Sequence, residues 1–76
     1  MIPIIDVLKS CDAFHSEGFE SKNGLERLKD KFNCPEKVAF AAIERDIGNE
    51  LLNYGTSIRT AWVTEQGKQL LKQIEI

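Results

Sequence analysis

The stretch between residues 51 and 71 constrains the fold of this chain more than any other part of the sequence. Two segments suited to β-strands flank Gly55, and the second, residues 58–63, is rich in β-branched and aromatic residues, so the pattern predicts a β-hairpin. Thr64 follows, where its hydroxyl is suited to cap a helix, and Glu65 would lie at the positive end of that helix dipole. Apolar residues then recur on one helical face at Leu70, Leu71 and Ile74. The sequence therefore predicts a two-stranded ribbon that leads directly into a capped helix.

Three helices are predicted before the hairpin. Pro3 stands at a favourable helix start and Gly18 at a favourable stop, so the first helix lies between them. Its apolar residues have helical spacing: Ile4, Val7, Leu8, Cys11 and Phe14. Asn23, with Glu26 three residues later, predicts the N-cap of a second helix over residues 24–32.

The third predicted helix begins at Pro35 and runs to about Ile47, because Gly48 is a stop signal. Residues 19–20 are predicted as a very short strand. The chain has no repeat, low-complexity tract or linker, so we expect a single domain over residues 1–76. The predicted order is helix, short strand, helix, turn, helix, hairpin, helix.

This order and the segment WVTEQGKQLL, residues 62–71, resemble the winged helix-turn-helix superfamily, specifically the small MarR- and PadR-type regulators of bacteria and phages. The segment is similar to the aromatic-aliphatic-Thr-Glu-x-Gly-x-x-Leu-Leu pattern between the wing and the last helix of those families. The apolar spacing from Ile43 to Leu52 is similar to the way their recognition helix leads into the wing. The resemblance extends over residues 18–74. It implies an α+β, mostly α-helical fold with a three-helix core, a β-hairpin wing over residues 51–63 and a C-terminal helix.

The resemblance also implies a function, because helix-turn-helix proteins place their recognition helix in the major groove of duplex DNA. Here that helix is the one predicted over residues 35–47, and its two sides can be laid out at about 100° per residue. The side predicted to face the core carries Phe40, Ile43 and Ile47, flanked by Ala39. The opposite side carries Lys37, Val38, Ala41, Ala42 and Arg45.

The residues on that opposite side suit contact with DNA. Small side chains such as Val38 and Ala41 allow the backbone to approach a groove, while Lys37 and Arg45 can reach phosphates or a guanine edge. Arg59, near the predicted hairpin tip, is placed for a minor-groove or phosphate contact. With two lysines of the preceding helix, the predicted DNA-binding residues are Lys37, Val38, Ala41, Arg45, Arg59, Lys29 and Lys31. The alternative for these cations is a solvated or carboxylate-paired surface charge.

We therefore predict a small, sequence-specific transcriptional regulator of bacterial or phage type that binds double-stranded DNA. A formal net charge of −2, from 10 basic and 12 acidic residues, gives no general attraction to nucleic acid. The alternative is a winged-helix protein–protein interaction module, an adaptor or inhibitor, that engages a partner through Trp62 or through Val38, Ala41 and Ala42. Convergence of the five predicted cations on one side would favour DNA.

The N-terminal helix predicts a homodimer, because it has more apolar residues than one face can bury. We place Ile2 and Ile5 in that interface. Trp62 is a further candidate interface residue, since strand alternation turns it away from Val63 and the core, and exposed tryptophans often mark interfaces. The alternative is that a neighbouring helix covers Trp62.

No catalytic residue, metal site or cofactor is predicted, and we do not expect an enzyme. His15 is the single histidine, and with Cys11 and Cys34 it falls short of the four ligands usual for structural zinc. The five glycines are isolated and form no phosphate-binding loop. No apolar run approaches the roughly 20 residues of a membrane span, and the early acid Asp6 argues against a signal peptide. Together with two unpaired thiols, this predicts a cytoplasmic protein that does not contact a membrane.

Overall fold

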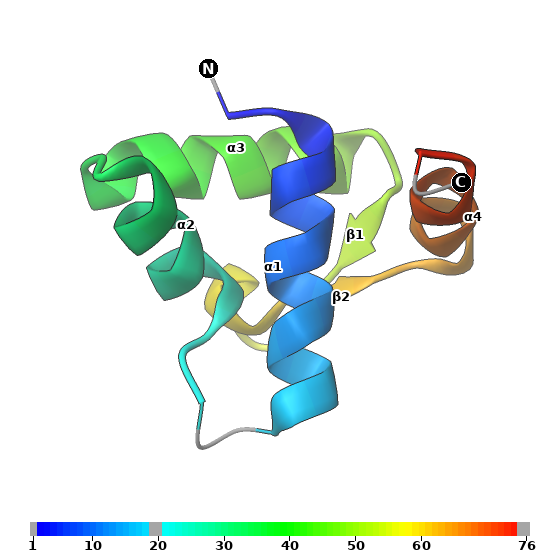
Figure 1. Cartoon of the computed structure of the whole chain (residues 1–76), viewed down its shortest axis with the longest axis horizontal. Coiled ribbons are helices and arrows are strands. Elements are labelled where there is room, and N and C mark those ends of the chain that lie inside the picture. The colour runs from blue at the N-terminus through cyan, green and yellow to red at the C-terminus, as the bar shows by residue number, and fades with distance from the viewer. Residues whose placement is uncertain (1, 19–20, 75–76) are drawn as a thin grey trace.

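A computed structural model describes residues 2–18 and 21–74 (Figure 1). These residues form a small α+β unit that is mostly helical, as predicted from the sequence, with a Cα radius of gyration of 11.1 Å. Its elements are α1 (Ile4–Glu17), α2 (Gly24–Phe32), α3 (Glu36–Gly48), β1 (Leu52–Asn53), the 3-10 turn η1 (Ile58–Thr60), β2 (Trp62–Val63) and α4 (Glu65–Ile74). In Figure 1, α1 runs across α3, with α2 towards one end of α3 and α4 beyond the other. The strand predicted at residues 19–20 lies outside the described residues.

The helix ends follow the local signals in the sequence. The side chain of Asn23 accepts a hydrogen bond from the Glu26 backbone N–H at 2.9 Å, and the hydroxyl of Thr64 accepts one from the Gly67 N–H at 3.1 Å. Both predicted N-caps are therefore confirmed. Gly18 ends α1 with φ 97°, a conformation that L side chains rarely adopt, and its N–H donates to Phe14.

The structure contains the predicted hairpin, but its strands are short. Leu52 pairs with Val63 and Asn53 with Trp62 in an antiparallel sheet of two strands. The prediction of a strand over residues 58–63 is wrong for residues 58–60, which form η1. Ser57 starts this turn, because its hydroxyl accepts from the Arg59 N–H and its carbonyl accepts from the Thr60 N–H. The connection between the strands therefore contacts α2 and α3 instead of extending away from them (Figure 1).

One hydrophobic core joins the helices and the sheet. Its residues are Ile2, Val7, Leu8, Cys11, Leu25, Leu28, Ala39, Ala42, Ile43, Leu51, Leu52, Ala61, Val63 and Leu71. Ile43, predicted to face the core, is buried together with Leu25, Leu28, Val63 and Leu71, while Ile47 and Leu70 are half-buried at the edge of the core.

The predicted core face of α3 is displaced from the observed one. Phe40 is 38% exposed, so its assignment to the core is wrong, and Ala42, assigned to the outward side, is buried. The face that packs inward is centred on Ala39, Ile43 and Asp46, roughly a fifth of a turn from the predicted one. Small alanine side chains allow α3 to pack closely against its neighbours, and the larger Phe40 is left at the surface.

The apolar surplus of the N-terminal segment is largely covered within one chain. Ile2 is only 4% exposed and packs mainly within its own chain, so little of its surface is left for the predicted dimer interface. Ile4 and Ile5 are half-buried and pack against the core. Homodimerisation itself stays a prediction, with Ile5 as the predicted interface residue that still has exposed surface.

The glycine in the Thr64–Glu65–x–Gly67 motif has a steric role. A Cβ at Gly67 would clash with the backbone oxygen of Leu51 and lie 2.7 Å from a methyl carbon of Val63. The Thr64 hydroxyl also donates to the Glu50 carbonyl at 2.7 Å. These contacts hold the start of α4 against the end of α3 and the first strand.

Candidate interaction site

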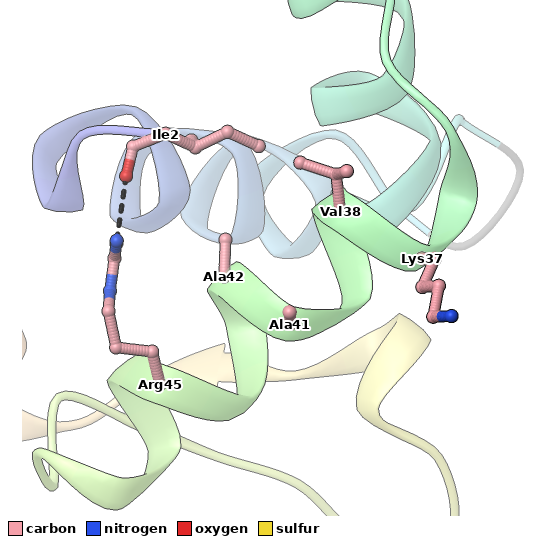
Figure 2. Close-up of a pocket in the computed structure, with 6 residues that line it drawn as sticks. All are labelled: Ile2, Lys37, Val38, Ala41, Ala42 and Arg45. Carbon is pink, nitrogen blue, oxygen red and sulfur yellow. Dashed lines mark hydrogen bonds between the residues drawn. The ribbon is translucent and has the colours of Figure 1, made fainter.

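The outward side of α3 borders a hollow of about 450 Å³ at the surface (Figure 2). We call it the α3 groove, and its lining residues are Ile2, Lys37, Val38, Ala41, Ala42 and Arg45. The side chains of Ile2 and Val38 point toward one another across it, whereas Lys37 points away from Ile2 at the N-terminal end of α3 (Figure 2). The structure thus brings together four of the predicted DNA-binding residues around an apolar surface, and Val38 in it is 44% exposed.

Arg45 is held by the interior of the protein. Its Nε and Nη2 atoms donate to the two carboxylate oxygens of Asp46, each at 3.1 Å, and Nη1 donates to the backbone carbonyl of Ile2 at 2.9 Å. The Asp46 side chain is fully buried. A buried carboxylate needs a partner of opposite charge, so the guanidinium is fixed in place. Arg45 is therefore turned away from the outward position that reading a base edge would require.

Arg59 also has a partner within the chain. Its Nη2 lies 2.5 Å from Oε1 of Glu36, and both side chains are about half exposed. Arg59 lies in the connection between the two strands, as predicted, but in η1 beside the start of α3, so its predicted place on a strand is wrong. Pairing with a carboxylate, the alternative left open from the sequence, is what the structure has, although Glu36 is on a helix and not on the opposite strand.

The other predicted cations lie in different parts of the surface. Lys31 forms an ion pair with Asp6 of α1, on the side where α1 and α2 meet. Lys29 borders a separate hollow with Lys22, Glu26 and Asp30. Lys37 forms no ion pair among the described residues. Of the five cations, only Lys37 and Arg45 line the α3 groove, and Arg45, Arg59 and Lys31 form ion pairs within the chain.

Trp62 lies apart from the α3 groove and is 39% exposed. Its ring meets the ring of His15 edge-on, with centroids 6.2 Å apart, and the Nε2 atom of His15 lies 3.0 Å from the Thr60 carbonyl oxygen. Gly55 lies beside the same ring. The C-terminal end of α1 thus covers one part of Trp62, as in the alternative that a neighbouring helix covers it. Another part stays exposed, and the role of Trp62 in an interface stays a prediction.

Among the described residues, no three side chains of His, Cys, Asp or Glu are grouped so that they could hold a metal ion. Burial, then the charges of Asp46 and Asp12, raise the pKa of the Cys11 thiol to about 12, so it stays protonated near neutral pH and is a poor nucleophile. Cys11, one of the apolar residues at helical spacing, is buried in the core, and Cys34 is half-buried.

Two features of the groove were missed from the sequence. Ile2 was assigned to a dimer interface, although it forms a wall of the groove, and Asp46 was not recognised as the partner of Arg45. A helical projection centred on the alanines of α3 would have placed Asp46 beside Ala39 and Ile43, on the inward side. An acid on the inward side of a helix, next to an arginine in the sequence, indicates an internal ion pair.

Comparison with protein-family models, curated proteins and solved structures finds no match for this chain. None of the helices within residues 2–18 and 21–74 has both the length and the apolar character to cross a membrane.

Proposed function

We propose that this chain is a winged-helix protein–protein interaction module that binds a partner in the cytosol through the outward side of α3. The order of α1, α2, α3, hairpin and α4 supports the winged-helix assignment. The observation that carries the function is the α3 groove, where the side chains of Ile2, Val38, Ala41 and Ala42 leave an apolar hollow at the surface. An apolar hollow with a few charged groups at its edge is a common form of binding site.

The charges favour a protein partner over DNA. A nucleic-acid interface needs cations that converge along the phosphate backbone. Here Arg45 is engaged with Asp46 and Ile2, Arg59 with Glu36, and Lys31 with Asp6. With a net charge of −2, the chain also lacks a general attraction to polyanions.

Duplex-DNA binding is the second candidate, and a specific arrangement supports it. Only residues 33–35 separate α2 from α3, and Asn33 adopts a left-handed conformation, φ 48°, that turns the chain sharply between the helices. The exposed side of α3 includes Lys37 and Ala41. An exposed pair such as Arg59–Glu36 contributes only about 0–1 kcal/mol, so a phosphate would displace the carboxylate at small cost.

The test compares Val38→Asp with Thr56→Asp, an equal change of charge at an exposed position outside the groove. Each variant and the wild type are tagged in the native host, and proteins that co-purify are quantified by mass spectrometry. We expect a specific partner whose recovery falls at least about tenfold with Val38→Asp, equivalent to 1.4 kcal/mol, and not with Thr56→Asp. Equal recovery with both variants would contradict the proposal.

A parallel arm addresses DNA. The purified wild type is titrated at low salt with mixed-sequence duplex fragments, and binding is followed by fluorescence polarisation. We expect no saturable binding. Saturable binding that Lys37→Ala weakens and Val38→Asp abolishes would replace the proposal with the DNA-binding candidate.

A further inference from the structure

We infer that the α3 groove accepts an acidic amphipathic peptide segment, which inserts an aliphatic side chain beside Ile2 and Val38 and places a carboxylate near Lys37. The inference rests on the proposed function and specifies the chemistry of the partner at the same site. Its basis is the combination of an apolar lining, an uneven distribution of charge around it and a wall that is fixed before binding.

The lining determines what can enter the groove. Four of its six residues are aliphatic, namely Ile2, Val38, Ala41 and Ala42. Its volume of about 450 Å³ falls within the range of about 300–1,000 Å³ typical of binding pockets. An aliphatic side chain gains free energy when it becomes buried there, whereas a charged group would lose its hydration without a partner.

The charged residues of the lining are both cations, and no carboxylate is among the six. They are not equivalent. The charge of Arg45 is balanced by Asp46, while Lys37 has no ion pair among the described side chains. Lys37 and Arg45 are eight residues apart, about 12 Å along the helix axis. A partner that fills the groove therefore meets uncompensated positive charge at the Lys37 end, and an acidic residue there is the complementary choice.

The wall opposite α3 is fixed before a partner binds. The Ile2 carbonyl accepts from Arg45, whose guanidinium is held in turn by the buried carboxylate of Asp46. Pro3 continues the segment in an extended conformation and leads directly into α1. Because Ile2 is already in place, binding does not have to order this segment, and more of the contact energy appears as affinity.

The probe is a phage-displayed library of random peptides, each long enough for about four helical turns. It is selected against the immobilised full chain, against Lys37→Glu and against Lys68→Glu, which makes the same change of charge on α4. We expect the wild type and Lys68→Glu to enrich sequences with aliphatic residues at helical spacing and a flanking Asp or Glu. Lys37→Glu should shift the flanking residue to Lys or Arg, because the local charge is reversed.

A synthetic peptide from the selection is then titrated into methyl-labelled protein by NMR. We expect the largest shifts at the methyl groups of Ile2, Val38, Ala41 and Ala42, and an affinity at least about tenfold lower for Lys37→Glu. Lack of enrichment, enrichment of basic peptides by the wild type, or shifts centred elsewhere would overturn the inference.

Failure of the inference is distinguishable from failure of the proposed function. If Val38→Asp abolishes recovery of the native partner and the selected peptides show no acidic preference, only the chemistry of the partner is wrong. If Val38→Asp leaves recovery unchanged, the groove is not the interaction site and both proposals fall.

Discussion

The two ends of α3 differ in their ion pairs, because one pair includes a buried carboxylate and the other is exposed. At the C-terminal end, Arg45 makes a bidentate contact with a fully buried carboxylate and also binds the backbone of Ile2. At the N-terminal end, Glu36 and Arg59 meet at one pair of atoms in solvent. Arg45 and Arg59, both predicted to contact DNA, thus differ in how free they are to bind a ligand. A buried pair is fixed because separating it leaves an unpaired charge in the interior, whereas an exposed pair exchanges readily with water, salt or a ligand.

A large effect is expected at the buried end. Arg45→Ala would leave the Asp46 carboxylate without its partner and remove the hydrogen bond to Ile2. Breaking a buried ion pair from one side costs about 3–5 kcal/mol, and since Arg45 is partly exposed we expect a value near 3 kcal/mol. Urea unfolding followed by circular dichroism measures the loss, which is a large part of the roughly 5–15 kcal/mol that stabilises a small domain.

The matched control removes both charges. In the double variant Arg45→Met with Asp46→Leu, no buried charge remains and the side-chain volumes are similar, so we expect most of the stability to return. A loss below about 1 kcal/mol for Arg45→Ala would place this pair in the same energetic class as an exposed one and remove the contrast.

The second prediction compares two apolar residues of α3. Ile43 is fully buried and Phe40 lies towards the exposed end, so Ile43→Ala should lower the unfolding free energy by about 2–5 kcal/mol and Phe40→Ala by about 1 kcal/mol. Chemical denaturation of both variants in parallel gives the two values. The reverse order would restore the helical face predicted from the sequence.

Local features of the fold were predictable from the sequence, whereas the rotation of α3 about its axis was not. The helix boundaries, the caps at Asn23 and Thr64 and the position of the hairpin depend on contacts within a few residues, and these were predicted correctly. The rotation of α3 depends on which face packs against α1 and α2. Hydrophobicity favoured Phe40 for the inward side, while close packing selects the smaller Ala42.

The candidate site was less predictable for the same reason. The outward position of Lys37, Val38 and Ala41 follows from helical periodicity and agrees with the structure. The contacts of Arg45 with Ile2 and of Arg59 with Glu36 join residues that are distant in the chain. Such pairs depend on the tertiary arrangement, so the sequence left their cations as equal candidates.

The third prediction concerns Cys11 of α1, whose thiol is buried near Asp46 at the C-terminal end of α3. Burial, with added effects of Asp46 and Asp12, raises the pKa of the Cys11 thiol from 9.0 to about 12. As the pH rises, the Cys11 thiol therefore loses its proton in the unfolded state before it does so in the folded state. The free energy of unfolding that the neutral thiol contributes below pH 9.0 falls as the pH rises towards 12. Near pH 10 the loss should be about 1.4 kcal/mol relative to neutral pH.

The measurement compares the wild type with Cys11→Ala in urea near pH 8 and pH 10. Other groups titrate in both proteins, so their contribution cancels in the difference. The wild type should lose about 1.4 kcal/mol more than the variant between the two conditions. An equal loss would show that the thiol is hydrated and that the interior beside Asp46 is open to solvent.

The smallest effect is expected at the exposed end of α3. Arg59→Ala and Glu36→Gln should each lower the unfolding free energy by less than about 1 kcal/mol, and a double-mutant cycle should give a coupling of about 0.2–1 kcal/mol. At 1 M salt, where the Debye length is about 3 Å, the coupling should vanish. A coupling that persists in salt would show a pair as firmly held as Arg45–Asp46.

The weakness of this pair also provides a sharp test of the DNA-binding candidate. If Arg59 contacts a phosphate, Glu36 competes with DNA for the same guanidinium, so Glu36→Gln should raise affinity for duplex DNA while Arg59→Ala lowers it and reduces the salt slope by about one unit. Both variants should keep nearly the wild-type melting temperature, because the pair contributes little to stability. A protein-binding module predicts a different result. Neither variant would bind duplex DNA in a polarisation titration at low salt, and peptide binding at the α3 groove would be unchanged in both, since neither residue lines it.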